Sequence, residues 1–268
     1  MTTSETQVFR DIPYAKYGDR EVLLDVYLPA DTAKPFPTIL SIPGGGWRVS
    51  PKENVPSQFA KKGFAVVSIT YRSSAEVLAP GNVHDCKAAV RWIRANASTY
   101  GFDSAHIGAF GISAGGHLVE VLGTTAGVKD LEGDGGNPDF DSSVQAVCGL
   151  CGPCDLTRIT IPKYKENYPD LYQVTFEYLG GPVEEKLDLA RLVSPLAYVS
   201  KNTVPMMLVH GDIDPIVPLD ESLVFHDALK EAGVDVSLKV VKGAGHGIPW
   251  GDAEDDLALS FFKRCFKK

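Results

Sequence analysis

Short apolar runs alternate with longer amphipathic segments along this chain. Near the N-terminus, every second position is apolar at Val22, Leu24, Val26 and Leu28, which is the period of a strand with one buried face. A turn-like stretch separates this segment from another apolar run at 8–14. The two runs therefore predict an antiparallel hairpin over 8–28.

The rest of the chain alternates between apolar runs and helical patterns. Buried strands are predicted over 38–42 and 63–71, and further strands over 106–110, 144–150, 206–210 and 236–241. Helices are predicted over 52–62, 84–98, 113–124, 219–232 and 252–266, and the one at 84–98 has a clear apolar face. With the hairpin, this order predicts an α/β fold: a mostly parallel, eight-stranded sheet with helices on both faces.

One segment, at about 157–195, interrupts the alternation. It is rich in tyrosine and charged residues and contains proline and glycine residues that favour turns. We expect short helices here, inserted between two strands as a small cap over the edge of the sheet. A chain of 268 residues with 44% hydrophobic residues is long enough for one large core, so we expect a single domain over 1–268.

Composition excludes several classes of partner. The formal net charge of −8 argues against binding to nucleic acid or to an anionic membrane surface. An odd set of five cysteines is no disulfide framework. The first residues carry no basic and apolar signal pattern, so we expect a cytoplasmic protein, or a secreted or periplasmic one if a signal has been removed. Nothing in the sequence predicts the oligomeric state.

A G-x-S-x-G pattern at Gly111, Ser113 and Gly115 lies between the strand at 106–110 and the helix at 113–124. This is the nucleophile-elbow pattern, in which a tight strand-to-helix turn exposes a serine hydroxyl above a sheet. The free N–H groups at a helix N-terminus favour negative charge there. The pattern alone is weak evidence, because such glycines also occur in ordinary turns.

Two later loops supply partners for the serine. Asp212 and Asp214 follow the strand at 206–210, and His246 follows the strand at 236–241. The order serine, acid, histidine predicts a triad in which His246 takes the proton of Ser113 and the acid orients the imidazole. We prefer Asp214 as the acid, because it precedes a proline-fixed turn into the next helix. Asp212 is then a carboxylate that braces the loop.

Three glycines, Gly44, Gly45 and Gly46, follow the strand at 38–42, and Trp47 comes next. A loop in this place donates backbone N–H groups to an oxyanion in hydrolases with a G-x-S-x-G elbow. Trp47 is a candidate to stack on a sugar or phenolic ring of a substrate, as is Trp250, although core packing explains both equally well.

Other candidates have simpler explanations. His117 and His210 are expected to pack or to brace their loops, and no histidine has a metal-like pairing. Cys151 and Cys154 form a C-x-x-C pattern, which is typical of dithiol redox centres but also occurs in loops after strands. We therefore expect no metal and no cofactor.

Several motifs together resemble those of the α/β-hydrolase carboxylesterases, in particular the BD-FAE-type and hormone-sensitive-lipase-like branches. They are P-G-G-G-W, Y-R-S-S-A-E, H-D-C-K-A-A-V-R-W-I-R-A-N-A, G-I-S-A-G-G-H-L, S-P-L, H-G-D-I-D-P-I-V-P and G-A-G-H-G, in the family's order from about 22 to 266. The resemblance implies the α/β-hydrolase fold and an oxyanion hole made by the N–H groups of Gly45, Gly46 and Ala114. These families usually carry a histidine where this chain has Pro43, so the loop is expected to be held differently.

The hypothesis is a serine carboxylester hydrolase that cleaves short-chain acyl esters through Ser113, His246 and Asp214. The expected partner is a small-molecule or carbohydrate-linked ester. An acetylxylan or feruloyl esterase is the alternative within this class, and hydrolysis of a formamide or a peptide ranks lower. A binding protein without catalysis and a thiol oxidoreductase using Cys151 and Cys154 are the alternatives from other classes.

Overall fold

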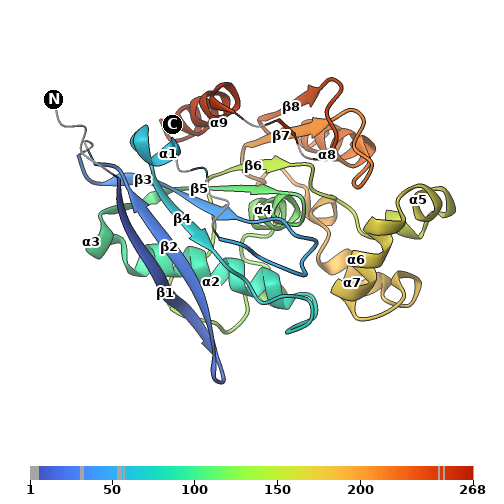
Figure 1. Cartoon of the computed structure of the whole chain (residues 1–268), viewed down its shortest axis with the longest axis horizontal. Coiled ribbons are helices and arrows are strands. Elements are labelled where there is room, and N and C mark those ends of the chain that lie inside the picture. The colour runs from blue at the N-terminus through green and yellow to red at the C-terminus, as the bar shows by residue number, and fades with distance from the viewer. Residues whose placement is uncertain are drawn as a thin grey trace.

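The fold is organised around one twisted sheet with the strand order β1-β2-β4-β3-β5-β6-β7-β8 (Figure 1). The computed structural model describes residues 6–30, 33–52, 56, 58–246, 248–249 and 251–267. The strands are β1 (Gln7–Tyr17), β2 (Arg20–Leu28), β3 (Phe36–Ile42), β4 (Ala65–Ile69), β5 (Phe102–Ile112), β6 (Ala146–Leu150), β7 (Met206–Gly211) and β8 (Val236–Val241). Strand β2 runs antiparallel to β1 and β4, and the remaining pairs are parallel. This confirms the predicted eight-stranded, mostly parallel sheet.

Helices cover both faces of the sheet. The α-helices are α1 (Gln58–Lys61), α2 (Gly81–Ala95), α3 (Ala97–Tyr100), α4 (Ala114–Thr124), α5 (Pro162–Asn167), α6 (Pro169–Leu179), α7 (Leu187–Leu192), α8 (Leu219–Glu231) and α9 (Asp252–Cys265). Short 3₁₀ helices lie at Lys129–Leu131, Arg158–Thr160, Val183–Glu185 and Pro195–Tyr198. One core contains residues of α2, α4 and α8, and the core on the other face contains residues of α1 and α9.

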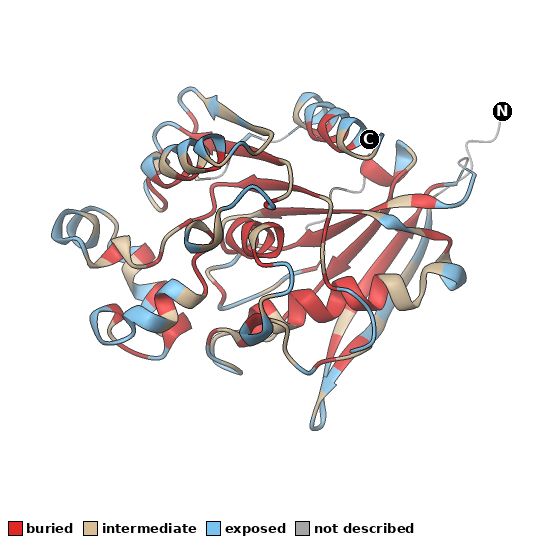
Figure 2. Cartoon of the chain, turned by 180° about the vertical axis from the view of Figure 1, so that it is seen from behind, coloured by how far each residue is buried: buried red, intermediate tan, exposed pale blue. Residues whose placement is uncertain are grey.

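The core follows the predicted pattern. In β2, Val22, Leu24 and Val26 are fully buried, and the hairpin pairs β1 with β2 as expected. The central strands are buried on both faces, while the exposed residues gather on the outer helices and the hairpin tip (Figure 2). Parallel strands covered on both sides need this near-continuous apolar sequence.

Two predicted helix boundaries were wrong. Helix α2 begins at Gly81 instead of His84, because the loop-like Asn82 is buried and its side-chain amide donates to the carbonyl of Arg72. The helix predicted for 52–62 contains only α1 among the described residues; 53–55 and 57 lie outside them. Lys52 is in a turn, where its ammonium contacts the buried carboxylate of Asp25 at 2.5 Å.

The segment at 157–195 contains short helices between β6 and β7. Helices α5, α6 and α7 lie together beside the carboxyl ends of the central strands (Figure 1). Loops at this edge of a parallel sheet converge on one crevice, which is where such folds bind ligands. No helix in the described ranges combines the length and apolar character needed to cross a bilayer.

Candidate active site

The serine of the G-x-S-x-G pattern occupies a strained turn between β5 and α4. Ser113 has φ 57° and ψ −123°, in the left-handed half of conformational space that side chains rarely adopt. A Cβ atom at Gly111 would overlap the carbonyl of Gly115, and one at Gly115 would overlap the carbonyl of Ile42. Glycine at both positions therefore permits the close packing that the turn requires.

Of the three predicted catalytic side chains, His246 lies within hydrogen-bond distance of both Ser113 and Asp214. The Oγ of Ser113 is 2.8 Å from Nε2 of His246, and Nδ1 of His246 is 2.8 Å from Oδ2 of Asp214. An imidazole with its proton on Nδ1 donates to the carboxylate and accepts from the serine hydroxyl. This is the relation that a serine nucleophile and its base require.

Asp214 is held as a carboxylate. Its side chain is fully buried, and Oδ1 accepts backbone N–H bonds from Ile216 at 2.8 Å and Val217 at 3.0 Å. Burial alone would raise the pKa of Asp214, but hydrogen bonds from His210, His246 and these amides hold the pKa well below its usual range. The carboxylate therefore remains ionised at neutral pH.

The two candidate acids, Asp212 and Asp214, have different hydrogen-bond partners. Oδ1 of Asp212 accepts the backbone N–H of Gly243 at 2.6 Å, which ties the loop after β7 to the loop after β8. The predicted bracing by His210 is also present, since its Nδ1 is 2.7 Å from the Ser222 hydroxyl and its Nε2 is 2.9 Å from the Val217 carbonyl.

The glycine loop after β3 presents free amides beside Ser113. Gly45 has φ 118° and Gly46 has φ 60°. Within the described ranges, no hydrogen bond uses the N–H groups of Gly45, Gly46 or Ala114. Free, fixed amides are what an oxyanion hole requires.

A cavity of about 690 Å³ opens at this point. It is bounded by the glycine loop, the elbow, the loop after β7 and helix α6. Its described lining is mostly apolar and comprises Ser41, Ile42, Pro43, Gly44, Gly45, Gly46, Trp47, Arg48, Pro51, Phe110, Ile112, Ser113, Ala114, Pro153, Asp170, Leu171, Val174, Ile216, Val217 and His246. Ser113 and His246 thus face a space large enough for a small organic ligand.

The glycine loop is braced by contacts that the sequence did not predict. The Tyr71 hydroxyl donates to the carbonyl of Pro43 at 3.2 Å. The indole of Trp47 stacks on Tyr178 of α6 with ring centroids 4.5 Å apart, and its Nε1 donates to Nδ1 of His117 at 3.3 Å. These contacts hold the loop next to Pro43, and α6 supplies part of the support.

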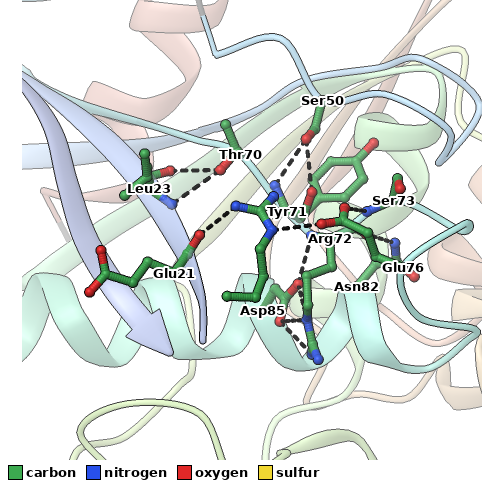
Figure 3. A network of polar contacts seen from close by, with 11 residues as sticks. Glu21, Leu23, Ser50, Thr70, Tyr71, Arg72, Ser73, Glu76, Asn82 and Asp85 are labelled. Atoms are coloured by element: carbon green, nitrogen blue, oxygen red, sulfur yellow. Dashed lines mark hydrogen bonds and ion pairs between the residues drawn. The ribbon is translucent and has the colours of Figure 1, made fainter. Parts of the chain in front are cut away.

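A polar network around Tyr71 and Arg72 adds to this support of the glycine loop (Figure 3). The hydroxyl of Ser50 donates to the Tyr71 carbonyl at 2.8 Å, and the Arg72 guanidinium pairs with the buried carboxylate of Asp85 at 2.8 Å. The backbone N–H of Ser74 donates to the carbonyl of Trp47 at 2.7 Å. The Y-R-S-S-A-E and H-D-C-K segments therefore connect the start of α2 to the glycine loop.

The structure places Trp47 in the core. The residue is 1% exposed, with one face of the indole covered by Tyr178. Packing of the loop accounts for these contacts, and a stacking role toward substrate stays a prediction. Trp250 lies outside the described residues.

The cysteines of the C-x-x-C pattern lack the surroundings of a redox pair. Both are buried free thiols, and Sγ of Cys154 donates to the backbone carbonyl of Glu221 at 3.1 Å. Burial raises the pKa of Cys151 to about 12 and that of Cys154 well above its usual value. Since reactive thiols need the thiolate, this environment opposes a dithiol function.

His117 makes stability depend on pH. Burial lowers the pKa of His117 to about 4, although the bond to the Val193 carbonyl opposes this, and Nδ1 must stay unprotonated to accept from Trp47. Between pH 7 and 4 the unfolded chain binds a proton here that the folded chain does not, so the free energy of unfolding falls as pH falls. At 1.36 kcal/mol per pKa unit the loss attributable to His117 approaches about 3 kcal/mol.

The measurement for this prediction is chemical denaturation of the wild-type chain and of His117→Gln between pH 7 and 4. A glutamine at 117 can donate to Val193 and accept from Trp47 without titrating. We expect the variant to lose less stability across this range. An identical pH dependence in both proteins would contradict the assignment.

The chain is similar to a known protein family and to several known proteins. The pattern that defines the BD-FAE family matches residues 24–229. Esterase LipQ of Mycobacterium tuberculosis is 32% identical over 88% of this chain, which spans 56% of that protein. A truncated carbohydrate esterase from gut microbiota superposes with a TM-score of 0.89 at 28% identity, over 100% of this chain and 99% of that one. Esterase Est2 of Thermogutta terrifontis with bound butyrate superposes with a TM-score of 0.75 at 27% identity, over 99% and 93%.

The chain thus spans little more than half the length of the curated relatives it matches. Its sheet and helices are those of α/β-hydrolase esterases, over nearly the full length of the solved structures just described. The family match covers most of the sheet and both motifs that contain Ser113 and Asp214. The chain therefore belongs to the BD-FAE family of α/β-hydrolase enzymes.

Proposed function

We propose that this chain is a serine carboxylester hydrolase in which Ser113 is the nucleophile, His246 the general base and Asp214 its orienting acid. The observation that supports it most is the continuous hydrogen-bond chain, with 2.8 Å between Ser113 and His246 and 2.8 Å between His246 and Asp214. Two of the proteins to which this chain is similar, LipQ and Est2, are named esterases, which agrees with this chemistry.

The first half of the reaction forms an acyl-enzyme. Nε2 of His246 takes the hydroxyl proton as Oγ of Ser113 bonds to the ester carbonyl carbon. The carbonyl oxygen becomes an oxyanion, which the N–H groups of Gly45, Gly46 and Ala114 are proposed to bind. The tetrahedral intermediate then expels the alcohol, to which the imidazolium of His246 gives its proton.

The second half returns the enzyme to its starting state. A water molecule loses a proton to His246 and attacks the acyl carbon, and Ser113 leaves with the proton as the free acid is released. Throughout, the ionised Asp214 stabilises the imidazolium without itself becoming protonated. Its low pKa is suited to this role.

Short acyl esters are the proposed substrates. Leu171 and Val174 of α6 form part of the apolar wall of the cavity. The related Est2 was solved with butyrate, a short-chain acid. We therefore expect kcat/KM on p-nitrophenyl acetate or butyrate to exceed that on the palmitate ester by at least about tenfold.

The measurement is a panel of p-nitrophenyl esters that differ only in acyl length, with all other conditions held constant. A kcat/KM that rises steadily to palmitate would contradict a short-chain site.

A carbohydrate-linked ester is the second candidate, since a carbohydrate esterase is among the solved structures that match over the full chain. Release of acetate from acetylated xylan at a higher kcat/KM than from p-nitrophenyl acetate would favour that candidate.

A further inference from the structure

A group of metal-ligating atoms lies beside the proposed triad. Sγ of Cys151, a carboxylate oxygen of Asp214 and a ring nitrogen of His246 all lie within 4.8 Å of one another. The described part of the chain contains no second group of three such atoms. The proposed hydrolysis makes no use of the thiol, so its place there needs a separate account.

The backbone directs the Cys151 thiol toward the histidine loop. The residue follows β6 with φ 42°, and its backbone N–H donates to the Val209 carbonyl at 2.9 Å. Sγ lies 3.7 Å from the backbone carbonyl of His246. The side chain is 1% exposed, so the thiol is held in this position by the core.

We propose that a soft divalent cation such as Zn²⁺ or Cd²⁺ binds Cys151, Asp214 and His246 and acts as an inhibitor. Thiolate, imidazole and carboxylate are the ligands that such cations prefer, with Zn–S about 2.3 Å and Zn–N or Zn–O about 2.0–2.2 Å. These lengths place tetrahedral ligands about 3.5 Å apart. The three atoms, already within 4.8 Å, reach this arrangement through small side-chain shifts, with water as the fourth ligand.

Binding would block catalysis through the imidazole. The Cys151 thiol loses its proton to solvent, and the cation takes the place of the proton on Nδ1 of His246. The ring then carries its proton on Nε2 and has no lone pair to accept the Ser113 proton. The cation also separates His246 from Asp214, which are 2.8 Å apart in the structure. Hard cations such as Mg²⁺ and Ca²⁺ prefer oxygen ligands and are expected not to inhibit.

Direct binding is tested in a Ser113→Ala background, which does not depend on activity. Cd²⁺ is added to this protein, and the ultraviolet charge-transfer band of a cadmium–thiolate bond is recorded. Cys154→Ala in the same background is the matched control, because it removes a thiol from the same loop that contacts Glu221 instead. We expect a band that saturates at one equivalent in the parent and in the control, and its loss in the Cys151→Ala version.

Inhibition is tested in the active protein, and only this part rests on the proposed function. We expect Cys151→Ala to hydrolyse p-nitrophenyl acetate within a few-fold of wild type and to need at least about tenfold more Cd²⁺ for half-inhibition. Cys154→Ala should keep the wild-type sensitivity. Circular dichroism shows whether each variant folds. If Cys151→Ala does not fold, Cys151→Ser is used in its place.

A cadmium–thiolate band and an inhibition that both persist without the Cys151 thiol would overturn the proposal. If Ser113→Ala instead keeps its esterase activity, the proposed function fails, while the titration of that protein still decides whether the cation binds. The two proposals therefore fail on different measurements.

Discussion

Ser113→Ala is expected to lower kcat on p-nitrophenyl acetate by at least ~10³-fold, which corresponds to about 4 kcal/mol of transition-state stabilisation. Alanine keeps the helix start but removes the oxygen that lies 2.8 Å from His246. Because the acyl-enzyme can no longer form, only the oxyanion site and binding remain. Steady-state release of p-nitrophenol by wild type and variant gives the comparison.

Ser41→Ala is the control for this experiment. Ser41 lines the same cavity and is 3% exposed, and no hydrogen bond within the described ranges joins its hydroxyl to His246. Removal of this hydroxyl is expected to change kcat by less than about tenfold. Near-full activity in Ser113→Ala, with both proteins folded, would rule out the serine as nucleophile.

Asp214→Asn is expected to lower kcat by ~10³–10⁴-fold with little change in KM. An asparagine amide at this place donates to Nδ1 of His246 and so favours the tautomer whose Nε2 carries the proton. The base is then unable to accept from Ser113, although the side chain keeps its size. The measurement is kcat and KM on p-nitrophenyl acetate at neutral pH.

Asp212→Asn is the matched variant for this prediction. It makes the same chemical change two residues earlier, on a carboxylate that accepts from the backbone of Gly243. We expect an effect of less than about tenfold. A larger loss of kcat in Asp212→Asn than in Asp214→Asn would reverse the choice of acid.

The fold was largely predictable because it depends on local and periodic features. A strand buried on both faces needs a continuous apolar run, and β6 and β7 were found this way. The predicted bounds of β6, β7 and β8 lie within two residues of the observed ones. The serine turn was predictable because only glycine fits at Gly111 and Gly115. The start of α2 was not, because Asn82 looks like a loop residue until its contact with Arg72 is known.

The contacts that support the glycine loop could not be predicted from the sequence, because they join segments that are distant along the chain. Trp47 meets Tyr178 from the helical insertion and His117 from the elbow helix, and no local pattern encodes these pairs. The available signal was Pro43, which stands where the resemblance to carboxylesterases implies a histidine. Arg48 and Glu177 add an ion pair between the same loop and α6. The insertion therefore contributes to the proposed oxyanion site as well as to the cavity wall.

The central claim is that the Ser113 hydroxyl is the activated nucleophile. A fluorophosphonate traps such a serine by forming an ester with its oxygen, and digestion followed by mass spectrometry locates the added mass. We expect one adduct per chain, on Ser113, and none after Ser113→Ala. An active enzyme that stays unlabelled at Ser113, or that is inactivated by labelling at another residue, would contradict it.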